Sequence, residues 1–198
     1  MSYVLGLTGS IGMGKSTTAG YFREIGVLVW DADAVVHTLY SKGNAGARAI
    51  ADIIPGAIKN GAVDRGALRQ AILADTDLLQ KIEAAIHPLV SDHRAGFLEN
   101  HADADLILCD IPLLFETGAD EWLDGVLVVT TTPEIQRERV LARPDMSVAM
   151  FENILAKQTP DAEKRQRADF IIDTGKGLDH ARQAVVSLAK QLQEAAHA

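Results

Sequence analysis

Residues 9–16 of this 198-residue chain read Gly-Ser-Ile-Gly-Met-Gly-Lys-Ser, a pattern whose chemistry is the binding of phosphate. Gly9, Gly14, Lys15 and Ser16 fit the spacing G-x-x-x-x-G-K-S of a phosphate-binding loop, or P-loop. Glycines let consecutive backbone N–H groups turn toward an anion, and a helix beginning near the lysine points the positive end of its dipole there. The lysine would supply charge for the β- and γ-phosphates of a nucleotide, and the serine a hydroxyl for Mg²⁺. The alternative is a glycine-rich turn that happens to precede a helix.

Two apolar segments flank this loop and must position it. Residues 3–7 have the length and composition of a buried strand, and residues 16–25 form an amphipathic pattern typical of a helix. Gly26 follows at the position where a helix commonly ends. Strand, loop and helix therefore come in the order that a P-loop requires.

Carboxylates follow two further apolar runs. Residues 27–30 lead into Asp31 and Asp33, and residues 106–109 lead into Asp110. In an open α/β sheet, ligands bind at the carboxyl ends of the strands, so these side chains are candidates for the site. Asp33 could accept a proton from an attacking hydroxyl or bind a metal, and the alternative is that it caps the following helix. Asp110 could orient Mg²⁺ directly or through water.

Residues 34–105 contain no clear strand and read as helical segments broken by glycines and by Pro88. Asp64 is placed to cap one of these helices, and the pair His87-Pro88 is expected to mark a helix break. His87 could be either a structural turn residue or a ligand-binding one. A helical insertion between the strands of a P-loop core is where an acceptor substrate would lie.

Arginines gather after the fourth predicted strand. Arg139 and Arg143 lie four residues apart on one helix face, where an anion between them would offset their repulsion. The alternative is that they pair with neighbouring glutamates. Pro144 interrupts the helix, and Ser147 can cap a second one over residues 148–157. Two short helices around a proline, with arginines on one side, resemble a hinged lid that excludes water and supplies cations.

The strands and helices alternate along the chain. The five predicted strands lie at 3–7, 27–30, 106–109, 126–129 and 170–172, and an amphipathic helix follows from 178 to 195. This order predicts an α/β protein with a doubly wound parallel sheet. The chain lacks the N-K-x-D element that reads guanine, whereas the insertion and the lid suit a kinase better than a nucleotide hydrolase. A general base at Asp33 would suit a hydroxyl acceptor.

Composition excludes several other classes. The 27 Asp and Glu residues outnumber the 19 Lys and Arg, for a net charge of −8, which argues against nucleic acid as a partner. Cys109 is the one cysteine, so no internal disulfide can form. We find no signal peptide and no apolar run long enough to cross a membrane, and so expect a soluble, cytoplasmic protein.

Several motifs together closely resemble the dephospho-CoA kinase family. They are L-T-G-S-I-G-M-G-K-S at 7–16, D-A-D at 31–33, H-P-L-V at 87–90, P-L-L-F-E at 112–116 and the run from 139 through 158 to 169. The resemblance implies that ATP phosphorylates the ribose 3′-hydroxyl of dephospho-CoA, the last step of coenzyme A synthesis, with Mg²⁺ present. It also implies a three-layer P-loop kinase fold with about five parallel strands. A helical substrate-binding insertion and a helical lid complete that fold.

The resemblance covers the whole chain, 1–198, as a single domain. The core would comprise about 1–33, 106–132 and 166–198, with a CoA-binding helical region at about 34–105 and a lid at about 133–165. Asp33 would be the base, Lys15, Arg139 and Arg143 would assist phosphoryl transfer, and Ser16 and Asp110 would hold the metal. The phosphates of ATP would lie on the P-loop residues Gly9, Gly12, Met13, Gly14, Lys15, Ser16 and Thr17. His87, Leu114 and Phe115 would line the acceptor side.

Two positions depart from the family pattern. Met13 is bulky where the family usually has a small residue, so its side chain must point away from the phosphates. Thr174 stands where the family commonly has an asparagine that contributes to the adenine site, which leaves nucleotide selectivity open. The alternatives are a nucleoside or nucleoside-monophosphate kinase and a regulatory P-loop NTPase. The sequence is compatible with a monomer or a weak homo-oligomer.

Overall fold

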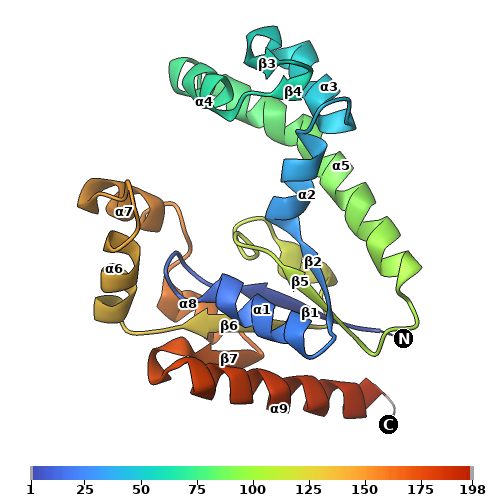
Figure 1. Cartoon of the computed structure of the whole chain (residues 1–198), viewed down its shortest axis with the longest axis vertical. Helices are drawn as coiled ribbons and strands as arrows, with labels where there is room; N and C mark the ends of the chain where they lie inside the picture. Colours follow the sequence, from blue (N-terminus) through green and yellow to red (C-terminus); the bar gives the residue numbers. More distant parts are fainter. Residues whose placement is uncertain (1, 197–198) are drawn as a thin grey trace. The chain divides into compact units, whose positions relative to one another are not determined.

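The computed structural model describes residues 2–196 and divides into two compact units. Of the described residues, 2–30 and 101–196 form the first unit. Asp31–Asn100 form the second (Figure 1). Within the described residues, none of the helices is both long and apolar enough to cross a bilayer.

A five-stranded sheet forms the centre of the first unit. Its strands are β1 (Tyr3–Thr8), β2 (Leu28–Asp31), β5 (Leu106–Asp110), β6 (Gly125–Thr130) and β7 (Phe170–Asp173), in the spatial order β2-β5-β1-β6-β7. β1 pairs in parallel with β5 and with β6, and β6 pairs in parallel with β7. The predicted α/β fold with a five-stranded parallel sheet is confirmed. The carboxyl end of β1, where the P-loop begins, lies in the middle of the sheet.

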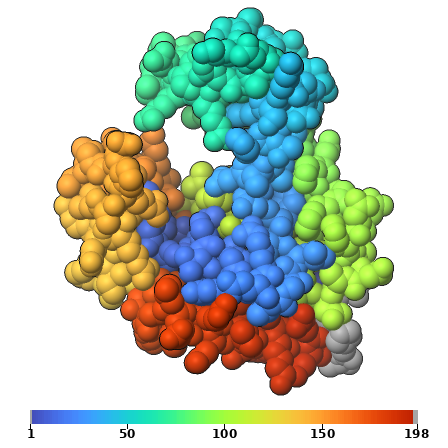
Figure 2. Space-filling view, in the orientation of Figure 1, coloured from blue at the N-terminus to red at the C-terminus, as the bar shows by residue number. Residues whose placement is uncertain are grey.

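Helices α1 (Lys15–Glu24) and α9 (Leu178–Ala196) pack side by side on one face of this sheet (Figures 1 and 2). Alternate residues of β1, Leu5 and Leu7, are fully buried in the core that Phe22 of α1 and Val185 of α9 complete. Burying a side chain of this size stabilises a protein by about 1.5–3 kcal/mol. The apolar strand and the amphipathic helix of the P-loop motif are thereby fixed to each other.

The other face of β1 approaches a loop closely. A Cβ on Gly6 would lie 2.7 Å from Leu114 Cδ1 and 2.3 Å from Leu123 Cδ1. The segment between β5 and β6, which includes the short helix η2 (Ala119–Trp122), thus packs on the sheet opposite α1 and α9.

Three helices lie between β6 and β7. They are α6 (Pro133–Leu141), α7 (Val148–Leu155) and α8 (Asp161–Gln166), followed after β7 by the short helix η3 (Thr174–Lys176). Thr132 caps α6, which has Pro133 in its first turn, and Ser147 caps α7 by accepting from the Met150 N–H. The two short helices around a proline are confirmed, and α8 is an element that the sequence pattern did not reveal.

The second unit has its own small core. It contains α2 (Ala32–Leu39), α3 (Ala45–Ile53), η1 (Pro55–Ala57), β3 (Ile58–Lys59), β4 (Ala62–Val63), α4 (Arg65–Ala74) and α5 (Asp77–Asn100). The buried side chains of this core are Ile50, Ala57, Leu68, Ile82 and Ile86. Asp64 caps α4 as expected, because its side chain accepts from two N–H groups of the first turn.

Two expectations for this region were wrong. Helix α5 runs through Pro88 without a break. A proline inside a helix costs about 3 kcal/mol or more, yet Ile82 and Ile86 hold the preceding turns of the helix in the core. The expectation of no strand was also wrong, since β3 and β4 pair around Asn60 and Gly61. Both turn residues have positive φ, 55° and 81°, the geometry for which an Asn-Gly pair is preferred.

Candidate active site

The loop between β1 and α1 has the backbone geometry of an anion site. Met13 N–H donates to the Ser10 carbonyl at 3.1 Å, closing a turn in which Gly12 has φ 81°. Gly14 has φ 90° and is the N-cap of α1, where it offers no side chain to the N–H groups of the first helical turn. Those N–H groups and the positive end of the helix dipole are the elements that bind phosphate.

Lys15 and Asp110 form an ion pair beside this loop. Lys15 Nζ lies 2.6 Å from Asp110 Oδ1, and their side chains are 17% and 5% exposed. The pair joins the first turn of α1 to the carboxyl end of β5. Both predicted residues are therefore together, with the lysine charge held at the loop by the carboxylate.

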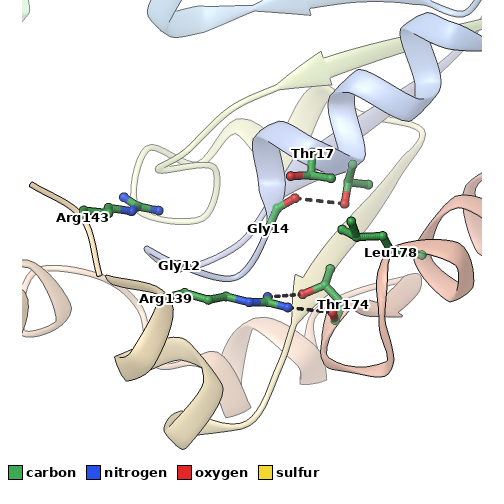
Figure 3. A pocket seen from close by; sticks show the side chains of 9 residues that line it. Gly12, Gly14, Thr17, Arg139, Arg143, Thr174 and Leu178 are labelled. Atoms are coloured by element: carbon green, nitrogen blue, oxygen red, sulfur yellow. Dashed lines mark hydrogen bonds between the residues drawn. The ribbon is translucent and has the colours of Figure 1, made fainter. Parts of the chain in front are cut away.

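Thr174 connects three elements through its hydroxyl group. Its Oγ1 donates toward the carbonyls of Met13 (2.9 Å) and Thr130 (3.2 Å), and accepts from Arg139 Nη1 at 2.9 Å (Figure 3). Arg139 Nη2 also donates to the Thr174 carbonyl at 2.9 Å. Because this guanidinium binds Thr174, the alternative in which Arg139 only pairs with neighbouring glutamates does not describe its contacts.

The side chain of Met13 lies in the core of the first unit, where it is 2% exposed. Its sulfur accepts from the Thr131 N–H at 3.2 Å. The bulk of this residue is thus accommodated under the loop, and its backbone carbonyl binds Thr174. Met13 can take part in phosphate binding through its backbone only.

A pocket of about 230 Å³ opens between the loop, α6 and α9 (Figure 3). Its lining residues are Gly12, Gly14, Thr17, Thr18, Arg139, Arg143, Thr174, Leu178 and Ala181. The pocket therefore combines loop backbone, two arginines and the apolar Leu178, a set suited to a nucleotide with its phosphates on the loop. The prediction that Arg139 and Arg143 share one helix face was wrong, because α6 ends at Leu141; Arg143 is exposed beyond the helix and lines the same pocket as Arg139.

Other predicted site residues lie elsewhere. Asp33 is exposed in the first turn of α2, and Asp31, rather than Asp33, caps that helix by accepting from the Ala34 N–H at 3.0 Å. His87 is exposed in the middle of α5. Both Asp33 and His87 belong to the second unit, so their proximity to the P-loop stays a prediction.

Leu114 and Phe115 are buried in the first unit. Leu114 is fully buried against Gly6, and the Phe115 ring lies under the Arg167 guanidinium, 4.2 Å from its carbon. The next residue, Glu116, accepts from the Thr159 N–H at 2.7 Å and pairs with Lys164 at 2.9 Å. The P-L-L-F-E segment is therefore attached to the region that follows α7.

Two side chains near the loop carry oxygen atoms of the kind that Mg²⁺ binds. Among the described residues, no cluster of three or more His, Cys, Asp or Glu side chains could hold a metal ion. Ser16 is an exposed residue in the first turn of α1, and Asp110 ends the strand β5. Mg²⁺ keeps several waters and takes few protein oxygens when it also binds phosphates, so a hydroxyl and a carboxylate fit such an ion.

The site also contains contacts that the sequence did not reveal. Gln136 of α6 and Gln158, just after α7, both bind the backbone of Ile11 in the P-loop. A glutamine has no characteristic spacing relative to a backbone group more than a hundred residues away. For Gln158, the one available signal was that the residue lies in the family motif that runs from 139 through 158 to 169.

A family model described as dephospho-CoA kinase matches residues 3–180. The chain belongs to the dephospho-CoA kinase family. A curated relative in this family, the dephospho-CoA kinase of Jannaschia sp. (strain CCS1), is 56% identical over 194 residues, which cover 98% of this chain and 99% of the relative. The dephospho-CoA kinase of Cereibacter sphaeroides is 55% identical over 194 residues, 98% of each chain. The resemblance that the motifs indicated is confirmed.

Solved structures share the fold of this family member. The Thermus thermophilus protein TT1252 is 31% identical, with a TM-score of 0.84 over 96% of this chain and 98% of that one. The dephospho-CoA kinase from Campylobacter jejuni is 24% identical, with a TM-score of 0.74 over 98% of this chain and 99% of that one. The agreement extends over both units of the chain.

Proposed function

We infer that this protein is an ATP-dependent kinase that phosphorylates the ribose 3′-hydroxyl of dephospho-CoA. The products are coenzyme A and ADP, and the reaction is the final step of coenzyme A synthesis. The observation that carries this conclusion is the identity of more than half of the residues with curated dephospho-CoA kinases over nearly the full length. The P-loop, with its lysine at the start of α1, supplies the donor chemistry that the reaction needs.

We propose specific roles for the residues of the first unit. The backbone from Gly9 to Thr17 would hold the ATP phosphates, and Lys15 would neutralise charge on the β- and γ-phosphates. Arg139 on α6, held by Thr174, and Arg143 just after that helix would add positive charge. Thr174 would contribute to the nucleotide site mainly by orienting Arg139, since its hydroxyl is already engaged with two carbonyls and that guanidinium.

Ser16 and Asp110 would hold Mg²⁺, directly or through water. When bound, this ion would supply positive charge against the phosphates. Asp110 would offer the ion or its waters the carboxylate that Lys15 contacts in this structure, and the lysine would serve the phosphates. We also propose that three residues serve the acceptor side, namely His87, Leu114 and Phe115. Because Leu114 and Phe115 are buried, they would act by supporting the residues that contact the acceptor.

Asp33 is the proposed general base. It follows β2 by two residues, and a carboxylate suits an alcohol acceptor because it can take the proton as the new O–P bond forms. Asp33→Asn should lower turnover by about 10²–10⁴ and leave ATP affinity nearly unchanged. Asp52→Asn, which removes an exposed carboxylate from α3 of the same unit, is the matched control. Near-normal turnover of Asp33→Asn would remove this residue from the mechanism.

The function is tested by measuring ADP release from ATP and Mg²⁺ with dephospho-CoA, AMP, adenosine or no acceptor. We expect strong stimulation by dephospho-CoA alone, with coenzyme A as product. Stimulation by AMP or adenosine would favour a nucleoside or nucleoside-monophosphate kinase. Release that no acceptor stimulates would favour a regulatory NTPase. A cytoplasmic location, the absence of nucleic-acid partners, and a monomeric or weakly oligomeric state stay predictions of the sequence.

A further inference from the structure

The backbone of Ile11, at the tip of the P-loop, is held in both directions by glutamine side chains. Its N–H donates to Gln158 Oε1 at 3.1 Å, and its carbonyl accepts from Gln136 Nε2 at 2.7 Å. Gln136 is 6% exposed, and Gln158 is partly buried. The two glutamines lie on either side of the segment that contains most of α6 and all of α7. This segment is therefore fastened to one P-loop residue at both of its ends.

The contact from Gln136 decides the orientation of one peptide group. Residues 10–13 form a turn closed by the Met13 N–H, with Gly12 at φ 81° and Ile11 outside the positive-φ region. These angles fit a type II turn, which differs from type I by a flip of the central peptide. The central peptide joins the Ile11 carbonyl to the Gly12 N–H. Because a trans peptide is planar, fixing the carbonyl on Gln136 points the Gly12 N–H in the opposite direction.

The orientation of that N–H matters because Gly12 lines the pocket. A flipped peptide would exchange a donor for a carbonyl oxygen at the place where the phosphates are proposed to bind. Glycine alone does not prevent the flip, because it tolerates both conformations of the turn. The side-chain amide of Gln136 is therefore the group that favours one of them.

We propose that Gln136 and Gln158 are positioning residues that hold the P-loop in its phosphate-binding conformation and couple it to the helices α6 and α7. The proposal rests on the nucleotide-binding part of the proposed function and is independent of the acceptor. Gln136 acts as a hydrogen-bond donor and Gln158 as an acceptor. Replacing glutamine with glutamate keeps an acceptor but removes the donor. This change should therefore be tolerated at Gln158 and not at Gln136.

The test compares binding of ADP and adenosine, without acceptor, in Gln136→Met, Gln158→Met and Gln158→Glu. Gln136→Met keeps the side-chain length but loses the donor, and should weaken ADP binding about tenfold. Gln158→Met should weaken ADP binding several-fold, whereas Gln158→Glu keeps an acceptor for the Ile11 N–H and should stay within about twofold of the parent. Adenosine affinity should change less than twofold in all three, because adenosine has no phosphate for the loop. Gln166→Glu, an exposed change on α8, is the charge control.

A merely structural role would lower the melting temperature without separating ADP from adenosine. Equal losses for both ligands in Gln136→Met, or ADP affinity within twofold of the parent, would overturn the proposal. If Gln136→Met does not fold, the Gln158 pair carries the test. Equal ADP affinities in Gln158→Met and Gln158→Glu would then overturn it. Failure of dephospho-CoA to stimulate ADP release would contradict the proposed function but leave these binding ratios interpretable.

Discussion

The first unit contains two lysine–carboxylate pairs that are alike in chemistry and different in setting. Lys15 pairs with Asp110 at 2.6 Å beside the P-loop, and Lys164 pairs with Glu116 at 2.9 Å beneath the region that follows α7. The Lys15 side chain keeps 17% of its surface exposed, whereas that of Lys164 is fully buried. One charge is thus accessible to a ligand and the other is enclosed by protein.

The carboxylate partners of the two lysines differ in their contacts and in their place in the fold. Glu116 also accepts from the Thr159 N–H, so it binds α8 and the segment before it at once. Asp110 ends a strand at the edge where ligands of α/β sheets bind. We therefore expect the Lys15 pair to open when nucleotide phosphates arrive and the Lys164 pair to persist throughout the reaction. An ion pair reveals little about function until its access to ligand is known.

The largest expected effect is on catalysis by the accessible pair. Lys15→Ala should lower turnover by about 10²–10³, because it removes charge stabilisation at the transferring phosphoryl group. The free energy of unfolding should also fall, by about 2–3 kcal/mol, because the Asp110 carboxylate left without its cation is only 5% exposed. Steady-state kinetics and urea denaturation check the two halves of this prediction. Retained turnover would mean that the loop is not the donor site.

The next effect is on stability through the enclosed pair. Lys164→Met keeps most of the buried volume but leaves Glu116 without its cation, and should lower the free energy of unfolding by about 2–3 kcal/mol. This lies below the roughly 3–5 kcal/mol typical of fully buried pairs, because the Glu116 side chain retains 17% exposure. Urea denaturation measures the loss.

A second substitution separates charge from packing at this pair. Glu116→Gln in the Lys164→Met background removes the unpaired charge and should recover part of the lost stability. If the double variant is less stable than Lys164→Met, the cost lies in packing. If Lys164→Met impairs turnover as severely as Lys15→Ala without loss of stability, the distinction between the two pairs fails.

Local sequence patterns were sufficient for the sheet and the P-loop. Apolar runs such as 106–109, bounded by turn or acidic residues, predicted all five strands, because a buried strand must be apolar along its length. Local rules failed where packing opposed them. Helix α5 continues through Pro88 because its apolar face is held by the core of the second unit, and no pattern around the proline reports that contact.

The candidate site was predictable only where a motif fixes backbone geometry. Lys15 and Asp110 could be assigned to one site because a P-loop and a strand end define it. The contacts of Thr174 and Gln158 join residues far apart in sequence, 161 positions for Thr174 and Met13 and 147 for Gln158 and Ile11. Side-chain hydrogen bonds to distant backbone groups depend on the final fold, and no periodicity encodes them. The role of Asp33 stays a prediction.

The smallest expected effect is the pH dependence of the enclosed pair. Burial alone would raise the pKa of Glu116, but its contacts with Lys164 and with the Thr159 N–H outweigh burial and lower the pKa below its ordinary value of 4.5. A carboxyl whose pKa is lower in the folded state stabilises the fold fully above the unfolded value, and this contribution is lost as the pH falls through the folded pKa. The stability advantage of the parent over Glu116→Gln should therefore be constant near neutral pH and shrink below about pH 4.5.

Urea denaturation of both proteins between pH 7 and pH 3 measures this difference, and Glu121→Gln, at an exposed position five residues along, should show no comparable change. An advantage that stays constant down to pH 3 would mean that the pKa of Glu116 is the same in the folded and unfolded states, which would contradict the lowered pKa. An advantage that grows as the pH falls would mean that the pKa is raised. Burial of Glu116 would then outweigh its contacts, and the ion pair with Lys164 would not stabilise the fold.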